Sequence, residues 1–421
     1  MSASKQPLGR PRPALGLSGG ALGERDFRRF FCAYSLSLVG SAMVPVALSF
    51  ALFAHGGGAT EVSAVLAAEM LPMVVLLLLG GVIADRLPKR RVMVGADLLR
   101  CASQALLAML LLTGHFALVP IMLLAALLGV GNAFYVPGRN GLMPQIVSAG
   151  HLQSANALCA IAQSAGTLVG PMLAGLLVAG AGAGWAIAID AASYAIGAGL
   201  MLSMHLHAPC APPRPATRMV DELAAGWVEF TRHLWVWLIV GQFSLFFLLV
   251  YGPMQVLGAL GFSHVAGGAL AWGGLLSMLG AGAVLGGVLG LRVQPRRPIR
   301  ASLLMFPLYA LVPGSLAAHL PWGVQAGCFL LGGLSLSMFN VLWETALQRE
   351  IAPDMLSRVA AYDVFGSLCL LPLGYVVAGP IAALLGVDGA LWLGAGYVVV
   401  STALVLLPAG VRAAAAVPAR A

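Results

Sequence analysis

Charge is scarce in this chain of 421 residues, and that scarcity is the first guide to its class. Charged residues make up only 9% of the chain, whereas hydrophobic residues make up 60%. A soluble domain carries about 25% charged residues. Apolar runs of about 20 residues, long enough to cross a bilayer core of about 30 Å as helices, follow one another along the chain. We therefore expect an all-α polytopic membrane protein.

Clusters of reactive side chains are missing as well. The six cysteines lie far apart, without metal-ligand or redox spacing, so we expect buried thiols and no metal site. No G-x-x-x-x-G-K-[ST] segment is present, which disfavours a primary ATP pump. No constellation of catalytic groups gathers near one membrane face, so we expect neither an enzyme nor a cofactor. The net charge of +8 is dispersed over many loops, which argues against nucleic-acid binding.

The basic residues that are present follow a regular pattern. Lys and Arg occur in every second gap between apolar runs, for example between residues 86 and 91 and at Arg139. The gaps near His55 and His115 carry none. Basic residues resist translocation, so the basic side should be the cytoplasm. We expect a multi-pass plasma-membrane protein of the bacterial inner-membrane type, with both termini cytoplasmic.

Twelve spans fit this alternation. We place them at about 30–54, 62–84, 92–113, 116–137, 153–179, 184–205, 235–257, 265–291, 299–319, 322–345, 356–385 and 388–410. The predicted organisation is a disordered cytoplasmic tail over 1–26, a six-helix bundle over 27–206, a cytoplasmic linker over 207–234, a second six-helix bundle over 235–411 and a tail over 412–421.

The linker contains its own helical pattern. After a proline-rich stretch, apolar residues recur at steps of three and four at Val220, Leu223, Trp227, Phe230 and Leu234. Such a stripe predicts an amphipathic helix lying at the membrane surface.

The two halves resemble each other. Gly-Gly-Val occurs at 80–82 and again at 286–288, 206 residues later, each time near the end of a span and before a group of arginines. A shared offset at the same place in each half indicates a duplicated six-helix unit, and hence two pseudo-symmetric bundles.

The turn between the second and third spans carries the most specific motif. It combines Gly81, Asp85, Arg86, Lys89 and Arg90 in the order G-x-x-x-D-R-x-x-[RK]-[RK]. A small residue allows close helix approach, and a carboxylate at the membrane edge needs a cation or a helix N-terminus as partner. The pattern resembles the loop 2–3 signature of the major facilitator superfamily.

That resemblance implies a conformational latch. In the superfamily the segment docks against the start of the eleventh span, which here holds Ser357 and Arg358, and stabilises the outward-facing state. Pro88 replaces the usual glycine of the turn, and Leu291 stands where a second copy of Asp85 would be, so the latch is expected in the first half only.

The fifth span contains Gly166, Gly170, Pro171 and Gly175. This pattern is similar to the superfamily's antiporter signature, G-x-x-x-G-P-x-x-G-G, with Ala174 in place of one glycine. The resemblance favours export over uptake, while ordinary small-residue packing remains the alternative reading. Residues 134–158 also resemble the branch that holds enterobactin exporters and macrolide efflux pumps.

Ionisable residues within spans are costly and need a reason. For Glu69 and Asp190 we consider proton coupling, since a buried carboxyl group can take up a proton on one side and release it on the other. A polar hydrogen bond between helices or a contact at an outer gate is the alternative. Asp97 and Arg100 are three residues apart, which predicts a structural ion pair.

Neutral polar and aromatic residues at mid-span depth could line a central cavity. The candidates are Gln104, Asn132, Tyr135, Gln163 and Asn340. Hydrogen bonding between helices is an equally good reading for each one.

The leading interpretation is a monomeric secondary transporter that exports a small amphiphilic molecule of the drug, macrolide or siderophore class, with protons as the coupling ion. A lysophospholipid flippase-like facilitator is the alternative within transport. A non-transporting membrane sensor is a further alternative, although the tails are short for a signalling domain.

Overall fold

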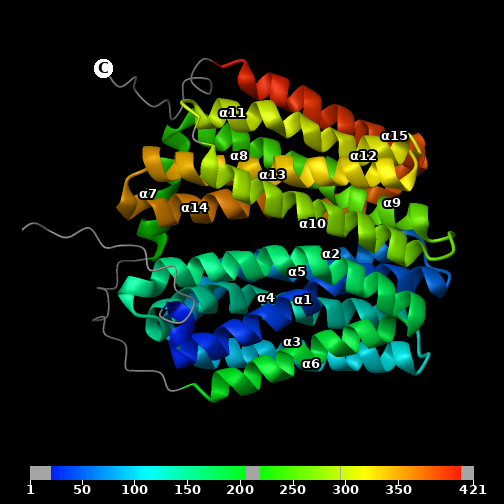
Figure 1. The fold of residues 1–421 in the computed structure, drawn as a ribbon, viewed down its shortest axis with the longest axis horizontal. Helices are drawn as coiled ribbons and strands as arrows, with labels where there is room; N and C mark the ends of the chain where they lie inside the picture. The colour runs from blue at the N-terminus through cyan, green and yellow to red at the C-terminus, as the bar shows by residue number, and fades with distance from the viewer. Residues whose placement is uncertain (1–19, 205–218, 294, 409–421) are drawn as a thin grey trace, which may run out of the picture.

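A computed structural model describes residues 20–204, 219–293 and 295–408. Within these ranges the chain forms helices and short turns, without strands (Figure 1). The description leaves out the side chains of 77–86, 140, 149, 219–225, 291, 353–354 and 357.

The first half contains six long helices, one for each predicted span. They are α1 (Arg25–Ala54), α2 (Ala59–Arg86), α3 (Lys89–Leu112), α4 (Leu118–Ile146), α5 (Leu152–Gly180) and α6 (Ala183–Leu202). Within this half α1 packs on α5 and α6, α2 on α4, and α3 on α4 and α6.

The second half contains more elements because several spans change helix type midway. It comprises α7 (Met219–Arg232), α8 (Leu234–Phe246), the π-helical segment η3 (Phe247–Tyr251), α9 (Gly252–Phe262), α10 (Gly268–Arg292), α11 (Pro298–Met305), the 3₁₀ segment η4 (Phe306–Ala310), α12 (Leu311–Ala317), α13 (Trp322–Glu350), α14 (Pro353–Leu368) and α15 (Leu371–Leu406). The seventh span is thus α8, η3 and α9 in series, and the ninth is α11, η4 and α12.

The eleventh and twelfth spans run on without a separating loop. The continuous apolar helical stretch from Arg358 to Leu406 is 49 residues long. At about 1.5 Å per residue it is more than twice as long as a bilayer core is thick. Gly386 interrupts it with φ 75° and ψ 164°, a conformation open to glycine, so the chain turns back here and crosses twice. The predicted count of twelve spans is confirmed in this form.

The start of α1 and the end of α15 lie at the same end of the molecule, at the left of Figure 1, and we call this end the termini side. The opposite end, the far side, carries the turns that join odd spans to even spans. Each of these six turns contains one residue with positive φ: Gly56, Gly114, Gly182, Gly267, His319 and Gly386. The shared turn geometry is a further sign of the repeated plan.

The first half is held together on the termini side by side chains that bind helix ends. Arg29 donates to the carbonyl of Ser203, and Arg90 donates to that of Leu202. Glu24 accepts hydrogen bonds from the backbone and hydroxyl groups of Ser148 at 3.1 and 2.8 Å. These contacts tie the beginning of α1 to the α4–α5 turn and satisfy carbonyls that a helix end leaves open.

The second half has an aromatic core. Phe243, Phe246, Phe306 and Phe339 lie with neighbouring ring centroids 4.6–5.6 Å apart, and Tyr309 contacts Phe246 at 5.0 Å. The rings come from α8, η4 and α13 and join three spans.

One part of the predicted organisation changes. The disordered tail does not extend to residue 26, because Ala21–Gly23 forms a 3₁₀ turn with Ala21 buried and α1 begins at Arg25. Residues 1–19, 205–218 and 409–421 lie outside the description. The expected surface helix is present as α7 and packs on α14 and α8, with Trp227 and Phe230 against Tyr362 at 5.5 and 5.9 Å.

Candidate transport pathway

The two halves meet along α5 and α10. A Cβ placed on Gly175 would lie 2.6 Å from the carbonyl oxygen of Ala269, and one on Gly280 would lie 2.7 Å from that of Thr167. A Cβ on Gly273 would come closer still, to the carbonyl oxygen of Pro171. Only glycine permits such backbone approach, so side chains are excluded from this contact.

The antiporter-like motif of α5 divides its contacts between two helices. Gly166 and Gly170 face α1, where added Cβ atoms would lie 3.1 Å from Cβ of Leu38 and 2.5 Å from Cβ of Ala42. Gly175 and Pro171 face α10 instead. The motif therefore lets α5 pack closely both on α1 of its own half and on α10 of the other half.

The junction between the halves lies towards the far side. Besides α5 with α10, α2 packs on α15, and Gly379 comes within reach of Thr60 near the far-side start of α2. On the termini side α8, α13 and α14 pack mainly on elements of the second half, as far as the described residues extend. The halves are thus closed on the far side and separate towards the termini side.

A cavity of about 490 Å³, the central cavity, lies between the halves. Its wall comes from α1, α5, η3, α9, α10 and α13 and includes Gln163, Asn340, Tyr251 and Gln255. Among its described lining residues none is Asp, Glu, Lys or Arg. The cavity is therefore uncharged, largely apolar and supplied with a few hydrogen-bonding groups.

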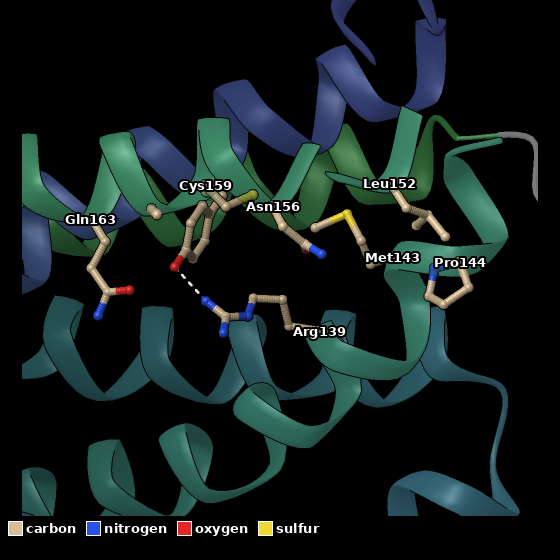
Figure 2. Close-up of a pocket in the computed structure, with 9 residues that line it drawn as sticks. Arg139, Met143, Pro144, Leu152, Asn156, Cys159 and Gln163 are labelled. Carbon is tan, nitrogen blue, oxygen red and sulfur yellow. Dashed lines mark hydrogen bonds between the residues drawn. The ribbon is translucent and has the colours of Figure 1, made fainter. Parts of the chain in front are cut away.

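Two further cavities lie within the first half. The α4–α5 cavity, of about 470 Å³, lies between Arg139, Met143 and Pro144 of α4 and Leu152 to Gln163 of α5 (Figure 2). The tyrosine cavity, of about 300 Å³, has Tyr34, Tyr135, Arg100 and Asn132 in its wall.

Gln163 lines all three cavities, so they adjoin at this residue. Tyr34 and Arg139 line both first-half cavities, and Arg139 donates a hydrogen bond to the Tyr34 hydroxyl, marked by the dashed line in Figure 2. The path thus runs from Pro144 and Leu152 near the termini side to the space between the halves.

A buried polar network borders the tyrosine cavity. The predicted ion pair is present, since Arg100 donates to Asp97 and both side chains are at most 5% exposed. The guanidinium also donates to Asn132 at 3.2 Å and lies 3.9 and 4.3 Å from the ring centroids of Tyr135 and Tyr194. Stacking between two rings compensates the charge for part of its lost hydration.

The carboxyl groups considered for proton coupling lie close to this network. Asp190 on α6 is fully buried and accepts a hydrogen bond from Gln104 at 2.7 Å. Glu69 on α2 is half-buried and close enough to Asp190 for electrostatic interaction. Tyr194, one turn after Asp190, shares a hydrogen bond with Ser41 of α1 at 2.8 Å.

The cavity candidates separate into two groups. Asn132 and Tyr135 border the tyrosine cavity, Asn340 the central cavity, and Gln163 all three. Gln104 differs from the expectation, because it is fully buried against Asp190 and lines none of the cavities described here. It is a polar contact between α3 and α6, the alternative that its sequence position also allowed.

The latch motif is only partly described. The side chains of Gly81, Asp85, Arg86 and Ser357 lie outside the description, so the docking remains a prediction. Lys89 lies against Gly141 of α4. Arg358 contacts the sulfur of Met355 at 3.4 Å and lies beside Gly226 of the linker helix.

Sequence reasoning missed Tyr34 and Arg139 as parts of the pathway, and Tyr194 as the second ring beside Arg100. A tyrosine in an apolar span is a usable signal, because its hydroxyl needs a partner there. Which arginine it meets depends on the packing of α1 against α4, which no spacing along the chain reveals. Metal-ligand clusters of three or more His, Cys, Asp or Glu residues do not occur among the described residues.

A sequence model of the Major Facilitator Superfamily matches residues 30–370. The chain belongs to this superfamily. Superfamily members of this kind are transporters, and the chain is a multi-pass membrane transporter rather than an enzyme.

Three curated relatives are similar over most of their length. The multidrug efflux pump Tap of Mycolicibacterium fortuitum is 28% identical over 82% of this chain and 86% of its own. Macrolide efflux protein A of Streptococcus pyogenes is 24% identical, with coverages of 86% and 90%. The enterobactin exporter EntS of Escherichia coli O1:K1 / APEC is 28% identical, with coverages of 79% and 78%. The expected efflux branch of the superfamily is thereby confirmed.

Solved structures support the fold. The nucleoside transporter NupG superimposes with a TM-score of 0.71 at 15% identity, covering 90% of this chain and 98% of that one. The major facilitator arrangement of two six-helix bundles is confirmed by this likeness.

Proposed function

We propose that this superfamily member exports a small amphiphilic molecule from the cytoplasm by alternating access, driven by proton antiport. The basic residues of the termini side support a cytoplasmic location for that side. The conformation described here is then open towards the cytoplasm and closed towards the outside.

The observation that carries the proposal is the connected path that ends in the central cavity. It leads from the termini side through the α4–α5 cavity to an uncharged space between the halves. A midplane site between two bundles that rock against each other is the arrangement of secondary transporters. The efflux relatives support the outward direction, and the mainly apolar wall supports an amphiphilic solute rather than a sugar.

Proton coupling is supported by the place of Glu69 and Asp190. A carboxyl group within the membrane is costly unless it has a function or a partner. Asp190 has Gln104 as one partner, while its Oδ1 atom is buried without a hydrogen bond in the structure. A proton could bind there in one state of the cycle and leave in the other.

The test is transport by purified protein in liposomes with an imposed proton gradient. Erythromycin and a catecholate siderophore are the first substrates to examine, since the relatives act on macrolides and enterobactin. Glu69→Gln and Asp190→Asn should each abolish gradient-driven accumulation if that residue carries the proton. Asp388→Asn is the matched control, because this carboxylate is exposed on the far side beside His319.

Two results would contradict the proposal. Undiminished gradient-driven transport by both Glu69→Gln and Asp190→Asn would remove these residues as proton carriers. Movement of lysophospholipid without any gradient, together with no transport of soluble amphiphiles, would instead favour a flippase-like facilitator.

A further inference from the structure

Arginine, and no carboxylate, reaches the wall of the first-half cavities. Arg139 lines both of them and Arg100 lines the tyrosine cavity, while their described lining residues include neither Asp nor Glu. Asp97, the partner of Arg100, lies towards Gly197 of α6, where an added Cβ would come within 3.3 Å of its Oδ2 atom. The guanidinium, and not the carboxylate, therefore faces the path.

Several neighbouring residues hold the Arg100 side chain in its position. Two tyrosine rings flank the guanidinium, and Gly131 of α4 leaves the space in which its side chain lies. The residue is 4% exposed, and its Nε–H has no hydrogen-bond partner in the structure. Arginine carries five N–H donors, and a buried donor without a partner costs free energy, so this group is suited to donate a hydrogen bond to an acceptor atom of a ligand.

We infer that the first-half cavities bind the anionic group of an amphiphilic substrate whose apolar body occupies the central cavity. This inference rests on the proposed export function and names its substrate class. A guanidinium pairs with planar or tetrahedral oxyanions, such as carboxylate, sulfonate and phosphate, through charge-assisted hydrogen bonds. The shared residue Gln163 places the charged and apolar sections side by side.

The rate at which charged reagents modify Cys159 can report the electrostatic potential in this path. Its thiol lines the α4–α5 cavity together with Arg139 (Figure 2). In a variant that keeps Cys159 and replaces the other cysteines by serine, the rates of modification by an anionic and a cationic methanethiosulfonate of similar size are compared. Each rate is normalised to the same reagent's reaction with a free thiol in solution.

We expect the normalised rate ratio to favour the anionic reagent by about tenfold, which corresponds to about 1.4 kcal/mol of electrostatic preference. Arg139→Gln should bring the ratio close to one, and Arg139→Lys should keep most of it. Asp97→Asn combined with Arg100→Gln removes both charges of the buried pair and should also reduce the ratio. A preference for the cationic reagent, or a ratio unchanged in both neutral variants, would overturn the inference.

Ligand protection completes the test. The anionic dye 1-anilinonaphthalene-8-sulfonate should slow the modification of Cys159, whereas N-phenyl-1-naphthylamine, the same skeleton without the sulfonate, should slow it much less. A parallel arm with lysophosphatidylglycerol distinguishes a lipid source of the anionic group from a soluble one, and stronger protection by either anion than by the neutral amine supports the inference. Equal protection by the neutral amine and both anions would contradict it.

A second cysteine position serves as a control in case the Cys159 thiol does not react. Gln163→Cys places a thiol where all three cavities meet. If neither reporter reacts with either reagent, the accessible path on which the inference depends is absent. These measurements use no proton gradient, so the anion preference can fail while export of neutral compounds persists, and export can fail while the preference remains.

Discussion

The two halves share a helix plan but differ in what their interiors contain. The first half buries Asp97, Arg100 and Asp190 among its helices, whereas the second half packs phenylalanines such as Phe246 and Phe306 against one another. In the first half tyrosine rings flank a charge, while in the second half rings from α8, η4 and α13 pack on one another. The repeated unit thus sets the helix order, and the interior chemistry is free to diverge.

The exception in the second half makes the contrast clearer. Asp363 of α14 accepts hydrogen bonds from the indole N–H of Trp343 at 2.8 Å and from the Ser367 hydroxyl at 3.5 Å, and no arginine of the described residues forms an ion pair with it. A single carboxyl group with an indole donor is a local contact. In the first half, by contrast, hydrogen bonds between polar side chains connect four helices, α1, α3, α4 and α6.

The largest expected effect comes from breaking the buried pair in the first half. Arg100→Gln leaves the Asp97 carboxylate in the interior without its cation, which should destabilise the fold by about 3–5 kcal/mol. The thermal unfolding temperature of the purified protein in nanodiscs measures this. Asp97→Asn with Arg100→Gln should recover most of the loss.

An exposed pair provides the control for that prediction. Arg232 pairs with Glu229 on α7 with 70% of the arginine side chain exposed, so Arg232→Gln should cost less than about 1 kcal/mol. If Arg100→Gln proves as mild as Arg232→Gln, the first-half interior is not organised around its charges.

The next effect concerns the contact between the halves. Gly175→Leu places a side chain against the backbone of Ala269, and overpacking of this kind costs about 1–3 kcal/mol. We expect the far side to open, with a longer distance between spin labels at residues 113 and 264 and a loss of transport. Gly180→Leu on the same helix has open space around it and should leave both unchanged. An unaltered distance in Gly175→Leu would show that this glycine contact does not hold the halves closed.

A smaller effect should distinguish the two kinds of aromatic residue. Phe246→Leu removes ring contacts to Phe306 and Tyr309, and each such contact contributes about 0.5–1.5 kcal/mol beyond its buried area. Tyr194→Phe keeps the ring beside Arg100 and loses the hydrogen bond to Ser41, worth about 0.5–1.5 kcal/mol. Chemical denaturation of both variants should therefore show the larger loss for Phe246→Leu, and the reverse order would contradict the contrast between the halves.

The smallest effect is a dependence on pH at the termini side. Partial burial raises the pKa of Glu24, but hydrogen bonds with His151 and Ser148 outweigh it and hold the pKa below its ordinary value of 4.5. A lowered pKa in the folded state means that the stabilisation is present above the unfolded pKa and is lost as pH falls through the folded one. The thermal unfolding temperature, measured from pH 7 into the acid range below 4.5, should fall slightly less in Glu24→Gln than in the native chain. Identical pH profiles would show that the contacts of Glu24 with Ser148 and His151 do not contribute to stability.

Hydropathy and charge alternation were sufficient for the helix order, because a bilayer demands long apolar helices and retains basic residues on one side. The internal changes of helix type at Phe247–Tyr251 and Phe306–Ala310 could not be predicted, since they depend on packing between spans. The Asp97–Arg100 pair was predictable because both residues lie on one helix face. The Gln104–Asp190 contact and the place of Arg139 join separate helices, which periodicity along one helix does not specify.

The uneven aromatic content has a spectroscopic consequence. Seven of the eight tryptophans lie at residue 227 or beyond, and Trp185 alone belongs to the first half, where it is exposed on α6. Tryptophan emission is therefore almost entirely a signal from the second half, with Trp235 and Trp343 in contact at 5.3 Å near its termini side. A ligand held by Arg100 and Arg139 would leave that emission nearly unchanged, while a movement of the second half would alter it, so the native chain can separate binding from rocking without an added label.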